Sequence, residues 1–353
     1  MRKIRVKICG YDDSEQDFRD NFIYKILIKY YDVEISEKPD YVFYNESSYK
    51  YLKYNCVRIF YTGENVSPNF NLCDYAVGYD YMIFGDRYYR YPLYHVMVFY
   101  DKNEAARIGP DFTKPEPFTR ADLAQKTEFC SFVYSNYLAD ERRKNFFDKL
   151  SQYKKISAGG RYLNNVGGII ESKLDFESKH KFSIAFENSS RLGYTTEKIA
   201  SSIAARTIPI YWGNPEIGRE FNDRRFISCH NYESFDRVVA RVKEIDNDDD
   251  LYLEIINQPI VAPGADFEKV KQGFEDFLRN IIDQPLPAAK RRTINPAKAL
   301  ELEKNERLAG RRARRRTAVK RFMAKLYRPL KKIKILEMLK QNYFIIKKRG
   351  PKT

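Results

Sequence analysis

Cysteine and histidine are scarce in this chain, and neither is arranged as a disulfide or metal site. The 353 residues include five cysteines, with no CxxC pair, and three isolated histidines. An odd, scattered set of cysteines excludes a disulfide framework, and the histidines lack the spacing of zinc ligands. The cysteine usage indicates a reducing compartment, and we expect no metal site and no obligatory cofactor.

Long apolar runs and a signal-peptide core are also missing. No stretch of about 18 consecutive apolar residues occurs, so the sequence predicts no membrane-spanning helix. The basic residues 1–3 are followed over residues 4–8 by apolar residues that alternate with charged ones. This alternation is typical of a strand and not of a signal peptide.

The first 300 residues carry no excess charge of either sign. The formal net charge is +15, and residues 301–353 hold 19 Lys and Arg against 4 Asp and Glu. The rest of the chain therefore holds 44 charged groups of each sign. The positive charge therefore belongs to a C-terminal appendage and says little about the body.

Short strands and helices alternate along the chain in two runs, separated by the proline- and charge-rich segment Lys102–Lys126. Such alternation predicts two doubly wound α/β domains, whose ligands bind at the carboxyl ends of the strands. We expect one domain at residues 1–126, a second at 127–285, and a tail at 286–353. The strands are expected near residues 4–8, 33–35, 41–44, 57–61, 75–78, 129–134, 182–186, 208–212 and 226–229.

A polar run follows one of these buried strands and leads into a helix. Phe182–Phe186 ends in Glu187-Asn188-Ser189-Ser190, and Thr195 or Thr196 can cap the next helix. The free N–H groups of a helix N-terminus favour phosphate. Lys198 opposes the helix dipole in the first turn, which an anion bound there would explain; a solvated lysine is the alternative.

The same stretch reads Phe-Glu-Asn-Ser, Gly-Tyr, Thr-Glu-Lys and Ile-Pro-Ile-Tyr-Trp-Gly over residues 186–213. It resembles the donor-binding motif of the α-1,3/4-fucosyltransferases, glycosyltransferase family 10, and most of all their bacterial branch. The similarity covers roughly residues 40 to 283. It extends to short motifs at Tyr61–Asn65, Asn69–Phe70, Cys73–Gly78, Val133–Asn136 and Gly159–Arg161.

The resemblance implies a GT-B architecture, in which two Rossmann-like domains face a cleft. The first domain would bind the acceptor and the second GDP-fucose. The implied reaction is inverting transfer of fucose from GDP-fucose to the GlcNAc of a lactosamine-type glycan. An α-1,3 linkage and a Lewis x-type product are favoured. An α-1,4 linkage, and an inactive module that binds glycan or sugar nucleotide, are the alternatives.

Two cations are implied at the donor diphosphate. Lys198 matches the phosphate-binding lysine of the family. Arg143 matches its phosphate-binding arginine by the distance to the following Phe-Phe-Asp, with the neighbouring Arg142 as the alternative. Displacement of GDP builds negative charge on the β-phosphate, and preorganised cations stabilise such charge.

Three further residues of the motif are implied at the donor. Glu197 would hydrogen-bond ribose hydroxyls, and Tyr194 would pack near the nucleotide. Asn188 would contact the diphosphate or the fucose.

The general base is expected on the first domain. An alcohol is a poor nucleophile until its proton is removed, and Glu64 is the matching residue of the family. Glu187 is the rival base, or it holds fucose hydroxyls. We favour Glu64 because a base on the acceptor domain approaches the sugar from the side opposite GDP, as inversion requires.

The tail combines a basic cluster at Arg311–Arg316 with a Lys-flanked apolar stripe. Spacings of three and four predict an amphipathic helix that bends at Pro329. We expect residues 311–348 to bind a membrane surface, so that the protein is peripheral on the cytoplasmic, inner face. Nucleic-acid binding and a solvated tail are the alternatives, and no nucleic acid is expected. The apolar stripe consists of Phe322, Leu326, Leu330, Ile333 and Leu336.

The run Asp246–Asp250 looks like the Asp-x-Asp metal motif of other glycosyltransferases. It follows one helical pattern and precedes another, and it lacks the hydrophobic strand that such a motif needs. We expect a solvated loop between helices there, and not a metal site.

Overall fold

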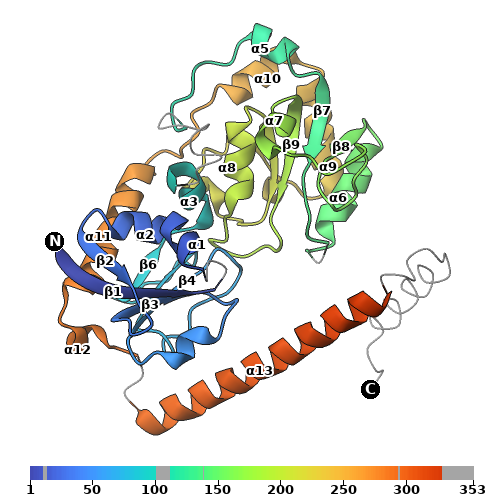
Figure 1. The fold of residues 1–353 in the computed structure, drawn as a ribbon. Coiled ribbons are helices and arrows are strands. Elements are labelled where there is room, and N and C mark those ends of the chain that lie inside the picture. Colours follow the sequence, from blue (N-terminus) through green and yellow to red (C-terminus); the bar gives the residue numbers. More distant parts are fainter. Residues whose placement is uncertain (11–13, 101–111, 138, 293–294, 328–353) are drawn as a thin grey trace.

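The computed structural model describes residues 1–10, 14–100, 112–137, 139–292 and 295–327 (Figure 1). Two parallel sheets organise the chain: a six-stranded sheet of order β2-β1-β3-β4-β5-β6 and a five-stranded sheet of order β11-β10-β9-β7-β8. The strands of the first sheet are β1 (Arg2–Cys9), β2 (Tyr31–Ile35), β3 (Tyr41–Tyr44), β4 (Val57–Tyr61), β5 (Tyr75–Gly78) and β6 (Tyr88–Arg90). Those of the second are β7 (Glu128–Phe132), β8 (Ile156–Ala158), β9 (His180–Phe186), β10 (Ile208–Trp212) and β11 (Ile227–Ser228).

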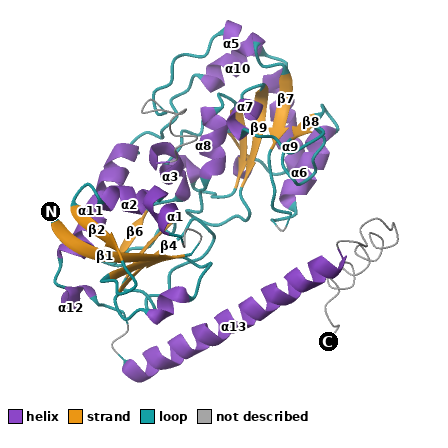
Figure 2. Cartoon of the chain, viewed as in Figure 1, coloured by secondary structure: helices purple, strands orange, loops and turns teal. Residues whose placement is uncertain are grey.

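Helices cover both sheets (Figure 2). Those before the second sheet are α1 (Glu15–Asp20), α2 (Phe22–Leu27), the 3-10 turn η1 (Lys50–Lys53), α3 (Leu93–Tyr100) and α5 (Arg120–Ala124). Those within and after it are α6 (Arg142–Ser151), α7 (Lys173–Glu177), α8 (Glu197–Ala204), η2 (Ile217–Arg219), η3 (Cys229–Asn231), α9 (Phe235–Asp246), α10 (Asp249–Ile256), α11 (Phe267–Asp283), α12 (Leu286–Ala289) and α13 (Pro296–Tyr327). The predicted doubly wound α/β architecture is therefore confirmed.

Each sheet is buried on both faces, which explains why its central strands read as continuous apolar runs. In the first sheet, β3 is buried at all four positions, between α1, α2 and α11 on one face and η1 on the other. In the second, β10 is buried at all five positions. Helices α6, α9 and α10 share one core with this sheet, and α3 and α8 share another.

Two helices pack against the sheet of the other run. The α3 side chains of Tyr94 and Val98 share a core with Ile199 of α8, although α3 follows the strands of the first sheet. Residues 267–283 fall in the range expected for the second domain, yet Phe274 of α11 packs under the first sheet. Helices α3 and α11 therefore connect the two sheets, because each packs in a core of the other run.

The tail begins as one long helix, α13, which runs along the molecule away from its starting point at the first sheet (Figure 1). The predicted bend at Pro329 and most of the predicted apolar stripe lie outside the described residues. The segment before α13 is fixed by Asp74, which is fully buried. Asp74 accepts hydrogen bonds from the backbone N–H groups of Arg291 (2.6 Å) and Arg292 (2.7 Å), and pairs with the Arg292 guanidinium.

Replacing Asp74 with alanine is expected to lower the free energy of unfolding by about 3 kcal/mol, because the substitution removes a buried carboxylate that accepts three backbone N–H bonds and pairs with Arg292. Asp86→Ala is the matched control. Asp86 pairs with the neighbouring Arg291 but is 46% exposed, so its loss should cost less than about 1 kcal/mol. Urea unfolding of both variants measures the difference. Equal losses would show that Asp74 does not anchor the tail.

Candidate active site

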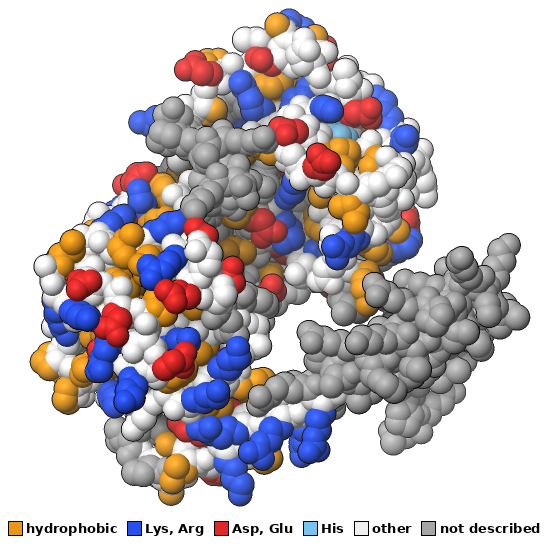
Figure 3. Space-filling model, viewed as in Figure 1, with side chains coloured by type: hydrophobic (Ala, Val, Ile, Leu, Met, Phe, Trp, Pro, Cys, Tyr) orange, Lys and Arg blue, Asp and Glu red, His pale blue; other side chains and the backbone are white. Residues whose placement is uncertain are grey.

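A pocket of about 220 Å³ opens between the two domains, at the carboxyl ends of both sheets. Figure 3 shows the hollow between the two lobes. Gly63, Glu64 and Leu93 line it from the first domain. The second domain supplies the other lining residues, whose polar side chains include Asn188, Tyr194, Thr196, Glu197 and Lys198. The pocket therefore brings together five of the predicted site residues, which come from segments more than a hundred residues apart.

Glu64 sits in the turn directly after β4. Its backbone N–H donates to Thr62 Oγ1 at 2.9 Å, and that hydroxyl donates to Glu46 Oε2 at 2.8 Å. These two hydrogen bonds fix the turn and hold the Glu46 carboxylate close enough for its charge to act on Glu64. Desolvation by the surrounding protein and the negative charge of Glu46 raise the pKa of Glu64, and Lys198 opposes this effect. A raised carboxylate pKa is what a general base needs near neutral pH.

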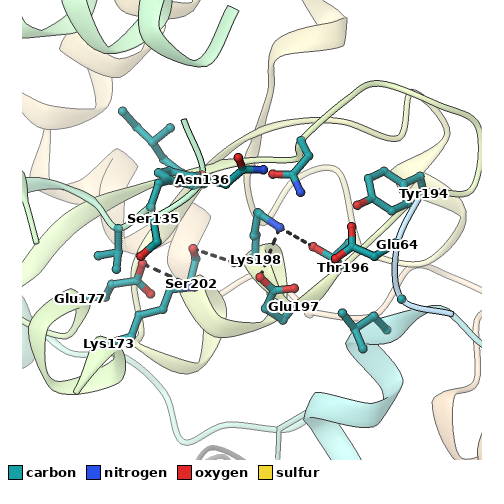
Figure 4. A pocket seen from close by; sticks show the side chains of 16 residues that line it. Glu64, Ser135, Asn136, Lys173, Glu177, Tyr194, Thr196, Glu197, Lys198 and Ser202 are labelled. Atoms are coloured by element: carbon teal, nitrogen blue, oxygen red, sulfur yellow. Dashed lines mark hydrogen bonds and ion pairs between the residues drawn. The ribbon is translucent and has the colours of Figure 1, made fainter. Parts of the chain in front are cut away.

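Lys198 lies in the middle of the pocket, where its Nζ points toward Thr196 and Glu197 (Figure 4). Nζ lies 3.0 Å from Glu187 Oε2 and 3.2 Å from Glu197 Oε1. Burial lowers the pKa of Lys198, but the charges of Glu187 and Glu197 outweigh it and raise that pKa above its usual value. The ammonium is therefore a permanent charge held on the second domain, facing Glu64 across the pocket.

Glu187 is fully buried, and both of its oxygens are engaged. Oε1 accepts from the backbone N–H of Thr196 at 2.7 Å, and Oε2 accepts from the Thr196 hydroxyl at 2.6 Å. Thr196 is the N-cap residue of α8, so Glu187 neutralises the positive end of that helix. The Glu187 carboxylate, at the end of buried strand β9, therefore organises the start of α8 and holds Lys198.

The loop between β9 and α8 packs against the first domain. Gly193 has φ of +77°, and a Cβ there would lie 2.4 Å from the carbonyl oxygen of Tyr79. Arg90 of β6 donates to that oxygen and to the Gly193 carbonyl, at 2.8 and 3.1 Å. Only glycine fits this approach. The next residue, Tyr194, is thereby packed edge-on against Tyr79, with ring centroids 5.0 Å apart.

Arg143 is the one predicted donor-binding residue that does not line this pocket. Its guanidinium is buried over the Tyr134 ring, 3.9 Å from the centroid. It donates to the Phe186 carbonyl and to Asn188 Oδ1, each at 2.9 Å. Arg143 therefore orients Asn188, and a direct contact with phosphate stays a prediction. The alternative, Arg142, is exposed and pairs with Asp140.

A wider pocket of about 500 Å³ adjoins the first and shares Gly63, Glu64 and Leu93 with it. It lies wholly on the first domain, and Phe22, Tyr61 and Tyr100 give it aromatic walls. Glu46 lines it, and Glu46 Oε1 has no hydrogen-bond partner among the described residues. Glu64 is thus placed at the junction of a pocket built mainly by the second domain and one built by the first.

Sequence reasoning missed several lining residues. Glu46 follows strand β3 as Glu64 follows β4, so polar residues at the carboxyl ends of strands were the available signal. Lys173 and Ser202 do not follow a strand and carry no such signal: Lys173 lies on α7, and Ser202 lies one turn beyond Lys198 on α8. Of the run Asp246–Asp250, predicted as a solvated loop, only residues 247 and 248 lie between α9 and α10. Asp246 ends α9, is buried and pairs with Lys154 and Lys181. The described ranges hold no cluster of three or more His, Cys, Asp or Glu side chains suited to a metal ion.

Comparison with known proteins gives consistent matches. The sequence model of the α-(1,3)-fucosyltransferase FucT N-terminal domain matches residues 7–97, and that of the glycosyltransferase family 10 (fucosyltransferase) C-terminal region matches residues 123–257. A crystal structure of an α1,3-fucosyltransferase is 30% identical, with a TM-score of 0.66, and the match covers 79% of this chain and 91% of that one. The chain belongs to glycosyltransferase family 10. This fucosyltransferase-family chain has the GT-B-like fold that the resemblance implied.

Other relatives of this family 10 chain agree. The α-(1,3)-fucosyltransferase FucT of Helicobacter pylori is 34% identical over 316 residues, which are 79% of this chain and 66% of the relative. The human 4-galactosyl-N-acetylglucosaminide 3-α-L-fucosyltransferase 9 is 27% identical over 142 residues, 38% of each chain. A structure of an α1,3-fucosyltransferase with GDP-fucose is 28% identical, with a TM-score of 0.64 and coverage of 81% of this chain and 93% of that one. The chain thus spans just under two thirds of the length of the bacterial relative.

Proposed function

We propose that this protein transfers fucose from GDP-fucose to a GlcNAc hydroxyl of a lactosamine-type glycan, forming an α-1,3 linkage with inversion and a Lewis x-type product. One observation carries the proposal: Glu64 of the first domain and Lys198 of the second line one pocket. A relative that is an α-(1,3)-fucosyltransferase supports the linkage, and a similar structure solved with GDP-fucose supports the donor. The acceptor would bind to residues 1–126 and the donor to residues 127–285.

In the proposed reaction, Glu64 takes the proton of the attacking hydroxyl, whose oxygen forms the new bond to the anomeric carbon. The bond from that carbon to the β-phosphate oxygen breaks, and GDP leaves with the electron pair. Lys198 would stabilise the charge that develops on the β-phosphate. Glu187, which is engaged at Thr196 and Lys198, is poorly placed to take a proton.

The other residues around Lys198 would bind the remaining parts of the donor. Glu197 is partly exposed beside Lys198 and would accept hydrogen bonds from ribose hydroxyls. Tyr194 would pack against the nucleotide. Asn188, held by Arg143, would contact the diphosphate or the fucose, so Arg143 would act through Asn188 where it does not reach phosphate itself.

Incubation with GDP-fucose and N-acetyllactosamine tests the proposal. We expect release of GDP and a fucosylated trisaccharide, and NMR analysis of the product gives the linkage and the anomeric configuration. Parallel reactions with type 1 and type 2 disaccharides distinguish α-1,4 from α-1,3 transfer. No GDP release with any β-linked GlcNAc acceptor would leave a binding module as the function.

We further propose that Glu46 helps to set the protonation of Glu64, beside the larger effect of burial. Since the charge of Glu46 raises the pKa of Glu64, neutral glutamine at position 46 should lower it. The base then stays ionised to lower pH, so the acidic limb of the kcat profile of Glu46→Gln should move to lower pH. Asp20→Asn, which removes a charge from the same wide pocket, should leave the limb in place. An unmoved limb in Glu46→Gln contradicts the proposal.

For the tail, we propose binding of residues 311–348 to the inner face of an anionic membrane. Arg311, Arg312 and Arg315 are exposed on α13, and all five cysteines are buried thiols, which supports a reducing compartment. Within the described part of the chain, no helix is long and apolar enough to cross a membrane. Residues 328–348 lie outside that part.

A further inference from the structure

A basic pocket of about 390 Å³ lies between the tail helix and the first domain, and it shares no lining residue with the two pockets described above. Lys50 and Lys53 line it from η1, and Arg307 and Arg311 line it from α13. Ser47 and Ser48 add hydroxyl groups to its wall. None of its lining residues in the described chain carries a carboxylate. We call this space the basic pocket.

Arg307 and Arg311 bring two like charges to one wall of this space, which costs free energy unless an anion compensates for them. Arg307 and Arg311 are four residues apart on one helix, a spacing at which like charges destabilise the helix. Within the described chain, Arg307 has one nearby carboxylate, Glu303 at 3.6 Å, and it also donates to the Leu52 carbonyl. Glu303 in turn is held by Arg58 at 2.7 Å, so one acidic group serves two arginines.

Contacts within the chain hold the walls of the basic pocket in place. Gly310 of α13 is buried against Tyr49, and a Cβ at this position would lie 2.7 Å from the Tyr49 ring. The helix thus lies in direct contact with the loop that carries Lys50. The Arg58 side chain, 2% exposed, fixes α13 through Glu303. A preformed site spares a ligand the cost of ordering the side chains that bind it.

The basic pocket adjoins the proposed acceptor side. Asn45 and Glu46 line the wide pocket beside Glu64, and the next two residues, Ser47 and Ser48, line the basic pocket. Gly10, at the carboxyl end of β1, also lines it. Both pockets therefore lie at the same edge of the first sheet.

We propose that the basic pocket is a phosphate site. Guanidinium groups bind two phosphate oxygens at once, ammonium groups act as point charges, and serine hydroxyls donate to the remaining oxygens. Two sources carry this chemistry: the headgroup of an anionic lipid, and a soluble phosphorylated molecule. The proposal goes beyond the transfer reaction and does not require it.

The test compares two doubly substituted full-length chains. Lys50→Gln/Lys53→Gln removes two cations of the basic pocket. Lys298→Gln/Lys304→Gln removes two lysines from exposed positions of α13 that neither line the pocket nor fall within residues 311–348. Inorganic pyrophosphate is titrated into each by calorimetry, and binding to vesicles of phosphatidylglycerol and phosphatidylcholine is measured by flotation. A GDP titration of each chain measures the donor pocket separately and reports that the chain is folded.

For the first variant we expect affinity for the phosphate probe to fall at least roughly tenfold, and to remain near that of the parent in the control. A loss confined to pyrophosphate identifies a soluble ligand, and a loss confined to vesicles identifies a lipid headgroup. Equal behaviour of the two variants with both probes overturns the proposal. If the first variant fails to bind GDP, Lys53→Gln is compared with Lys304→Gln in its place. Absence of GDP binding in the parent counts against the donor proposal alone.

Discussion

Glu64→Gln is expected to lower kcat by about 10²–10⁴-fold, the usual range for loss of a general base. The substitution keeps the size of the side chain and removes its ability to accept a proton at neutral pH. Glu64 lies at the junction of the two pockets, on the domain opposite the one that carries Lys198. GDP-fucose affinity, measured by calorimetry, should therefore stay close to that of the parent.

Glu187→Gln separates the two candidate bases. Glu187 holds the N–H of Thr196 and the ammonium of Lys198, so its neutralisation should weaken donor binding and lower the melting temperature. Glu64→Gln should change neither. The assignment of the base to Glu64 fails if Glu187→Gln abolishes turnover with intact donor binding while Glu64→Gln remains active.

The local pattern of the sequence was enough to predict the sheets. Strands β3, β4, β9 and β10 lie within a residue or two of the ranges expected from their apolar runs, because burial on both faces leaves a signal in each strand itself. The packing of α3 on α8 left no such signal. Neither did the return of α11 to the first sheet, because these contacts join distant segments.

The candidate site likewise combines features that the local sequence predicts with contacts that depend on the fold. Glu187 and Lys198 could be marked as polar groups at a strand end and a helix start, while their mutual ion pair depends on how the loop between them folds. The inward turn of Arg143 could not be predicted from spacing, since it depends on Tyr134 from another strand end. Most of the tail's apolar stripe remains a prediction.

Lys198→Met is expected to lower kcat by about 10²–10³-fold, the usual cost of losing one preorganised group that stabilises transition-state charge. Lys173→Met is the matched control. Lys173 also lines the pocket but lies at the end away from Glu64 and Tyr194 in Figure 4, so its loss should cost far less in kcat. Steady-state release of GDP measures both. A loss below about tenfold in Lys198→Met would remove Lys198 from the phosphate role.

Loss of Lys198 also leaves Glu187 buried without its cation, which should lower the free energy of unfolding by about 3 kcal/mol. The double variant Glu187→Gln/Lys198→Met separates this instability from catalysis. Glutamine carries no charge and can still accept from Thr196, so stability should largely return, as measured by urea unfolding. The kcat should stay low, because the cation at the phosphate is still missing. Recovery of kcat together with stability would show that Lys198 serves the fold and not the reaction.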